Sequence, residues 1–275
     1  MLTSSFDSVG TPHGPIRYSV TRAEVANAPW LVFLPGMLTD HRLFSPQLEH
    51  FTRGALHGKV NTFVWDPPAH GASRPYDLEA LTVDGIARQL IAILDSLAID
   101  GPVTLVGQSF GGIVGQAVLG LRADLADGFV GIDTMPLNRA YWNPLMLAGL
   151  KHAGPLLRMR SWPTILAEAP KETCHTEHAQ ELTREMLRDY TKDEYVALAS
   201  RIFRAIADAV SNNAPALLCP AALIVGEHDT MGGIKAMNQR WAAEEGISLT
   251  TVAGAGHNAN VDKPGPVNDL IEAFL

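Results

Sequence analysis

The feature that most constrains this chain is an alternation of apolar runs with amphipathic segments. Apolar runs at 29–36, 102–108 and 220–227 have the length and character of strands buried on both faces. The segments between such runs show helical periodicity, most clearly at 81–97. Strands and helices that alternate in this way form parallel sheets through right-handed crossovers. The alternation therefore predicts an α/β fold with a mainly parallel central sheet flanked by helices.

The alternation is interrupted once. From about 135 to 213 the pattern is helical throughout, and the strand–helix rhythm then resumes. We therefore expect a core domain made of residues 1–134 and 214–275, with 135–213 inserted as a helical cap, or lid. An insertion at this point would lie over the carboxyl edge of the sheet, where open α/β sheets bind their ligands.

Charge and composition exclude several classes of function. The net charge is −8 and no run of lysine or arginine is present, which argues against a nucleic-acid partner. No apolar run is long enough for a membrane span, and the first residues lack the basic start and apolar stretch of a signal peptide. The two cysteines are typical of free thiols in a cytoplasmic protein. A homodimer is compatible with the sequence.

A serine between two glycines is the strongest candidate for chemistry. Residues 107–111 read Gly-Gln-Ser-Phe-Gly, and a strand pattern leads into them while a helix pattern leads out. Gly-x-Ser-x-Gly in this setting places a serine on a sharp turn at the end of a strand. A second interpretation is that Ser109 only caps the helix that follows. We favour Ser109 as a nucleophile.

Such a serine needs a base and an acid that orients the base. His257 lies in a Gly-rich loop after the last strand pattern, and Asp229 lies just past the strand at 220–227. Asp133, one strand downstream of the serine, is the alternative acid. The order Ser…Asp…His favours Asp229. The backbone N–H groups of Met37 and Phe110 are the candidate donors of an oxyanion hole.

Four motifs together resemble the α/β-hydrolase superfamily, in its serine-nucleophile branch with a helical cap. "GQSFGG" resembles the nucleophile elbow, "GEHDT" the acid turn, "GAGHNANVDKP" the histidine loop and "DPPAHGAS" the loop after the second core strand. The resemblance covers nearly the whole chain and implies the same fold. Pro35-Gly36 replaces the His-Gly of many members. Serine at the nucleophile position argues against the epoxide hydrolase and haloalkane dehalogenase branches, which use aspartate.

These observations favour a carboxylesterase-like serine hydrolase that cleaves a carboxylic ester, thioester or lactone of a small, largely apolar substrate. Two alternatives remain open. One is a non-hydrolytic enzyme of the same fold (C–C cleavage, lyase or cofactor-independent oxygenase) with the His-Asp pair as general base. The other is a capped ligand sensor. No nucleotide fingerprint and no four-ligand metal pattern is present, so we expect no cofactor and no metal. The residues expected to contact the substrate are Gly36, Met135, Trp142 and Trp162.

Overall fold

The strands and helices follow the predicted alternation closely. The structure is a computed structural model, and it describes residues 6–210 and 217–275. The strands are β1 (Phe6–Thr11), β2 (Gly14–Thr21), β3 (Trp30–Leu34), β4 (Asn61–Trp65), β5 (Val103–Gln108), β6 (Gly128–Ile132), β7 (Ala221–Gly226) and β8 (Ser248–Val252). The helices are α1 (Ser45–Arg53), α2 (Val83–Ser96), α3 (Phe110–Leu121), α4 (Pro144–Lys151), α5 (Ala153–Met159), α6 (Trp162–Thr173), α7 (Glu177–Arg188), α8 (Lys192–Val210), α9 (Ile234–Glu245), α10 (Ala259–Asp262) and α11 (Pro264–Glu272).

The strands of the described residues form a single sheet. Their order is β1-β2-β4-β3-β5-β6-β7-β8. From β4 to β8 every neighbouring pair is parallel, whereas β2 pairs with β4 and with β1 in antiparallel fashion. The α/β fold with a mainly parallel sheet is thus confirmed. Because the parallel strands all end at the same edge, the loops that follow β3, β5, β7 and β8 meet there.

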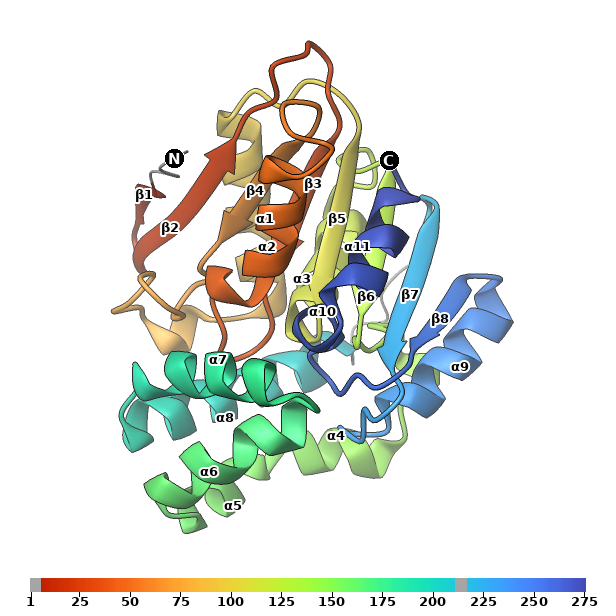
Figure 1. Cartoon of the computed structure of the whole chain (residues 1–275). Helices are drawn as coiled ribbons and strands as arrows, with labels where there is room; N and C mark the ends of the chain where they lie inside the picture. Colours follow the sequence, from red (N-terminus) through yellow and green to blue (C-terminus); the bar gives the residue numbers. More distant parts are fainter. Residues whose placement is uncertain (1–5, 211–216) are drawn as a thin grey trace.

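Helices cover both faces of the sheet, and the pleat divides the apolar side chains between them. In β3, Val32 packs in one apolar cluster with residues of α2 and α3, while Phe33 belongs to a second cluster with α1 and α11. Figure 1 shows α1 and α11 together on one side of the sheet. A sheet buried on both faces explains why its central strands are continuous apolar runs.

A layer of five helices, α4 to α8, lies beyond the carboxyl ends of the parallel strands (Figure 1). The layer is built from α6 packed on α7, and from α4 and α5 packed on α8. The division of the chain into a core and a cap at residues 135 and 213 stays a prediction, and residue 213 lies outside the described residues.

Candidate active site

Ser109 occupies a strained turn between β5 and α3. Its backbone has φ +49° and ψ −116°, a conformation that side chains with a Cβ rarely adopt. The turn is tightly packed, because a Cβ on Gly111 would lie 1.8 Å from the carbonyl oxygen of Leu34. The Ser109 side chain makes no capping hydrogen bond to the helix. The helix-cap interpretation therefore has no support in the structure, and the hydroxyl points elsewhere.

The hydroxyl of Ser109 lies next to His257. Ser109 Oγ and His257 Nε2 are 2.9 Å apart, and His257 Nδ1 is 3.1 Å from Asp229 Oδ2. The second oxygen of Asp229 accepts the N–H of Met231 at 2.8 Å, which fixes the carboxylate. His257 and Asp229 are both buried. Three loops from the ends of β5, β7 and β8 thus bring a hydroxyl, an imidazole and a carboxylate into one hydrogen-bonded row.

Asp133, the alternative acid, lies close to this row without joining it. It follows β6, and its carboxylate accepts the N–H of Gly226 at 2.7 Å and the N–H of Ala259 at 3.1 Å. Complete burial, reinforced by the nearby charge of Asp229, raises the pKa of Asp133 well above its usual range. The structure places Asp229, and not Asp133, within hydrogen-bond distance of His257.

Two backbone N–H groups beside Ser109 have no acceptor. Within residues 6–210 and 217–275, the N–H groups of Met37 and Phe110 donate no hydrogen bond to the protein. Phe110 opens helix α3, whose N-terminal end favours negative charge. These are the two N–H groups that the sequence suggested for an oxyanion hole.

Gln108, which the sequence did not single out, connects the nucleophile turn to its neighbours. Its buried carboxamide donates to the carbonyl of His257 at 2.9 Å and to the side chain of Asn258 at 3.1 Å. A Cβ on Gly36 would lie 2.1 Å from the Gln108 carboxamide oxygen, so the loop after β3 packs directly against it. Gln108 therefore holds the nucleophile turn to the histidine loop and packs tightly against the loop that carries Met37.

A cavity of about 580 Å³ opens above Ser109. Met135 and Trp142 line it, together with Met37, Phe110 and apolar side chains from the helical layer. Gly36 and Trp162 are not among the residues that line it, and contact of these two residues with the substrate stays a prediction. Gly36 packs on Gln108, and the ring of Trp162 packs edge-on against Tyr195, which itself lines the cavity. The apolar lining favours an apolar ligand. The hydrogen-bonded row reaches the cavity wall at Ser109 and His257.

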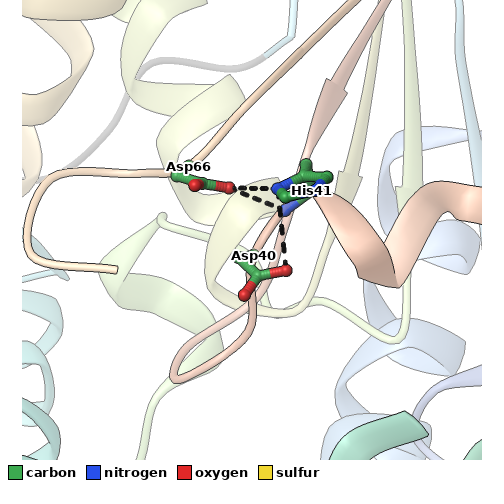
Figure 2. Close-up of side chains that lie close together, drawn as sticks. All are labelled: Asp40, His41 and Asp66. Atoms are coloured by element: carbon green, nitrogen blue, oxygen red, sulfur yellow. Dashed lines mark hydrogen bonds and ion pairs between the residues drawn. The ribbon is translucent and has the colours of Figure 1, made fainter. Parts of the chain in front are cut away.

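A second polar cluster consists of Asp40, His41 and Asp66 (Figure 2). Among the described residues it is the one group of three His, Cys, Asp or Glu side chains with ligand atoms within 4.8 Å of one another. Its oxygens already have donors: Asp40 pairs with Arg42, while Asp66 accepts from His41 and from the N–H of Ala72. Burial acts to raise the pKa of Asp66, but the bonds from His41 outweigh it and lower the pKa. The cluster fastens the loops after β3 and β4 together.

Comparisons with known proteins agree with the fold. A model of the alpha/beta hydrolase family matches residues 31–270. No curated protein is matched by the sequence. Among solved structures, a hydrolase from Pseudomonas aeruginosa has TM-score 0.78 at 21% identity, covering 99% of this chain and 98% of its own. An esterase from Thermogutta terrifontis has TM-score 0.72 at 20% identity, covering 98% of both chains. An enol-lactonase from Burkholderia xenovorans has TM-score 0.74 at 19% identity, covering 98% of this chain and 99% of its own.

Among the helices of the described residues, none is both long enough and apolar enough to cross a membrane.

Proposed function

This chain belongs to the alpha/beta hydrolase family, and we propose that it is a serine hydrolase which cleaves an ester, thioester or lactone of a small, largely apolar substrate. The observation that carries the proposal is the row of hydrogen bonds from Ser109 through His257 to Asp229, at the wall of an apolar cavity. In this arrangement the base lies between the nucleophile, on its Nε2 side, and the acid that orients it, on its Nδ1 side.

The proposed reaction begins when Ser109 Oγ attacks the substrate carbonyl while His257 Nε2 takes the hydroxyl proton. Asp229 holds the Nδ1–H of the imidazole and stabilises the imidazolium that forms. The negative charge on the carbonyl oxygen is stabilised by the N–H groups of Met37 and Phe110. The tetrahedral intermediate collapses as His257 gives its proton to the leaving oxygen or sulfur.

An acyl group then remains on Ser109. A water molecule, deprotonated by His257, attacks this acyl-enzyme and releases the acid. In a lactone the leaving alcohol stays attached to the acyl group, so the product is one hydroxy acid. The same groups act in the hydrolysis of an ester, a thioester and a lactone, so the geometry supports the reaction type. Which of the three the protein accepts depends on the cavity.

The cavity supports an apolar acyl group. Met146, Leu150 and Leu157 of α4 and α5 line it together with Ile206 and Phe203 of α8. Besides His257, the acidic and basic side chains described in the lining are Arg160 and Glu172, and they pair with each other at 2.9 Å. A neutral substrate therefore meets no unpaired charge there. We propose residues 135–213 as the cap that closes over it.

The test is a panel of p-nitrophenyl esters, thioesters and lactones, assayed with wild type and with Ser109→Ala. We expect wild type to hydrolyse at least one class, and Ser109→Ala to lose at least about 10³-fold in kcat. A fluorophosphonate probe should label wild type at Ser109 and leave the variant unlabelled. Unimpaired hydrolysis by Ser109→Ala with loss in His257→Ala would instead indicate general-base chemistry without an acyl-enzyme. No labelling of wild type would favour a ligand sensor.

A further inference from the structure

Asp262 joins the histidine loop to the helical layer. It ends α10, is 6% exposed, and accepts hydrogen bonds from two segments that are far apart in the sequence. Asp262 Oδ2 accepts the N–H of Gly256 at 2.8 Å and that of His175 at 2.9 Å. Asp262 Oδ1 accepts the N–H and the hydroxyl of Thr176, both at 2.7 Å. One carboxylate thus holds the residue before His257 and the start of α7.

The residue after His257 is held by the same part of the helical layer. The N–H of Asn258 donates to the carbonyl of Thr173 at 2.9 Å, and its side-chain amide donates to Thr183 at 3.3 Å. A Cβ on Gly256 would lie 3.1 Å from the carbonyl oxygen of Thr173, so the two backbones are in close contact. We call residues 173–176 the docking segment. His257 therefore sits between Asn258, whose N–H is bound to this segment, and Gly256, which is linked to it through Asp262.

The Asp262 carboxylate does this without a cationic partner. Among the described residues no lysine, arginine or histidine side chain forms an ion pair with it. A buried carboxylate that accepts several N–H and O–H bonds is a strong and directional anchor. Asparagine at this position would place an NH₂ group against N–H donors, so the anchor depends on both oxygens being acceptors.

We propose that Asp262 is a positioning residue for His257, through which the docking segment of the cap holds the imidazole within reach of Ser109. The inference rests on the proposed serine-hydrolase function. It gives the α6–α7 part of the cap a role in positioning His257, in addition to its role in lining the cavity. Small displacements of a catalytic group can cost about 10²-fold in rate, so loosening the loop at Gly256 is expected to be costly.

The experiment measures fluorophosphonate labelling of the full chain, with its rate and its end point read separately. The end point counts molecules with a competent site, and the rate reports how well Ser109 and His257 are placed. For Asp262→Asn we expect the labelling rate to fall by about 10-fold or more, with an end point like that of wild type. In ester hydrolysis kcat should fall with the labelling rate, while KM changes by less than about 2-fold.

Two matched controls separate positioning from folding. Asp269→Asn removes an exposed carboxylate on α11 and should label like wild type. Thr176→Val removes the hydroxyl donated to Asp262 and also the N-cap of α7. Thr191→Val removes the hydroxyl that accepts the N–H of Glu194 at the start of α8, away from the histidine loop. We expect Thr176→Val to slow labelling by about 3-fold or more, and Thr191→Val to leave the rate unchanged.

The outcomes distinguish failure of the serine-hydrolase proposal from failure of this inference. Absence of labelling in wild type overturns the serine-hydrolase proposal and this inference with it. Labelling of wild type, combined with an unchanged rate and a reduced end point in Asp262→Asn, overturns only the inference and makes Asp262 a folding anchor. If Asp262→Asn does not fold, Thr176→Val decides: a slower rate at full end point supports the inference, and a rate equal to that of Thr191→Val overturns it.

Discussion

Asp133 and Asp229 are neighbouring buried carboxyl groups, and of the two only Asp229 contacts the imidazole of His257. Asp133 accepts the N–H groups of Gly226 and Ala259, which lie just before Asp229 and just after His257. Asp133 therefore binds the two loops that carry the base and its acid, and leaves the imidazole to Asp229.

This relationship predicts unequal effects of the two isosteric substitutions. Asp229→Asn should lower kcat/KM for an activated ester by about 10³-fold or more, since the imidazole loses the acceptor that orients it. Asp133→Asn would place an NH₂ group against one of two N–H donors, so it should also lower kcat/KM, but by at least about 10-fold less than Asp229→Asn in protein that is folded. Steady-state kinetics at pH 8, normalised to the folded fraction by circular dichroism, checks both. The opposite ranking would make Asp133 the functional acid.

A pH dependence of stability follows from the raised pKa of Asp133. Burial, and then the charge of Asp229, raises the pKa of this carboxyl above its unfolded value of about 3.8. The folded state therefore holds the proton more tightly than the unfolded chain, and stability declines as pH rises above 3.8 toward the folded pKa. Relative to Asp133→Asn, wild type should lose up to about 1.4 kcal/mol per pH unit across this window. Urea unfolding of both proteins at pH 4.5, 6 and 7.5 measures this loss of stability. The same pH dependence of the free energy of unfolding in both proteins would contradict the prediction.

The nucleophile turn predicts a severe effect at Gly111. Alanine there would place its Cβ 1.8 Å from the carbonyl oxygen of Leu34, which is backbone and cannot rotate away. We expect Gly111→Ala to lose about 3 kcal/mol or more, or to fail to fold. Gly265→Ala is the control, because Gly265 is also helical and has open space around it. It should stay within about 1 kcal/mol of wild type. Thermal unfolding distinguishes them, and equal melting temperatures would disprove the clash.

From the cavity lining we predict that a substitution on α4 changes the acyl-chain preference. Met146 lines the cavity, while its neighbour Leu145 is 78% exposed and does not. Met146→Trp should fill space, so that kcat/KM falls by about 10-fold or more for an octanoyl ester and much less for an acetyl ester. Leu145→Trp adds the same side chain outside the cavity and should leave the ratio of the two esters unchanged. A ratio that shifts equally in both variants would place the acyl group elsewhere.

The sequence predicted well wherever the signal was local. The buried strands have apolar sequences, and Ser109 and Asp229 each follow such a strand within a few residues, whereas His257 follows the more exposed strand β8. The distances that join the three could not be read from the sequence, but their positions at strand ends place them at one edge of a parallel sheet. The same holds for Met37 and Phe110, since an N–H donor needs only the right place in the backbone.

The residues that support the site were not predictable, because their partners are distant in the chain. Gln108 bonds with the carbonyl of His257, 149 residues later, and Asp262 bonds with His175, 87 residues earlier. Neither has a distinctive neighbour pattern. The contact of Trp162 with Tyr195 was not predictable either, because it depends on the side-chain direction on α6. Such contacts are set by how elements pack, which composition and periodicity do not specify.

The positions of Ser109 and His257 along the chain set the order in which the parts of the site are synthesised. The turn that carries Ser109 is made well before the loop between β8 and α10, which carries His257 and the carbonyl that accepts from Gln108. The oxyanion loop, the serine and the first half of the sheet can therefore be complete while the hydroxyl has no base beside it. Under the proposed mechanism, a nascent chain that has not yet gained His257 would not hydrolyse esters.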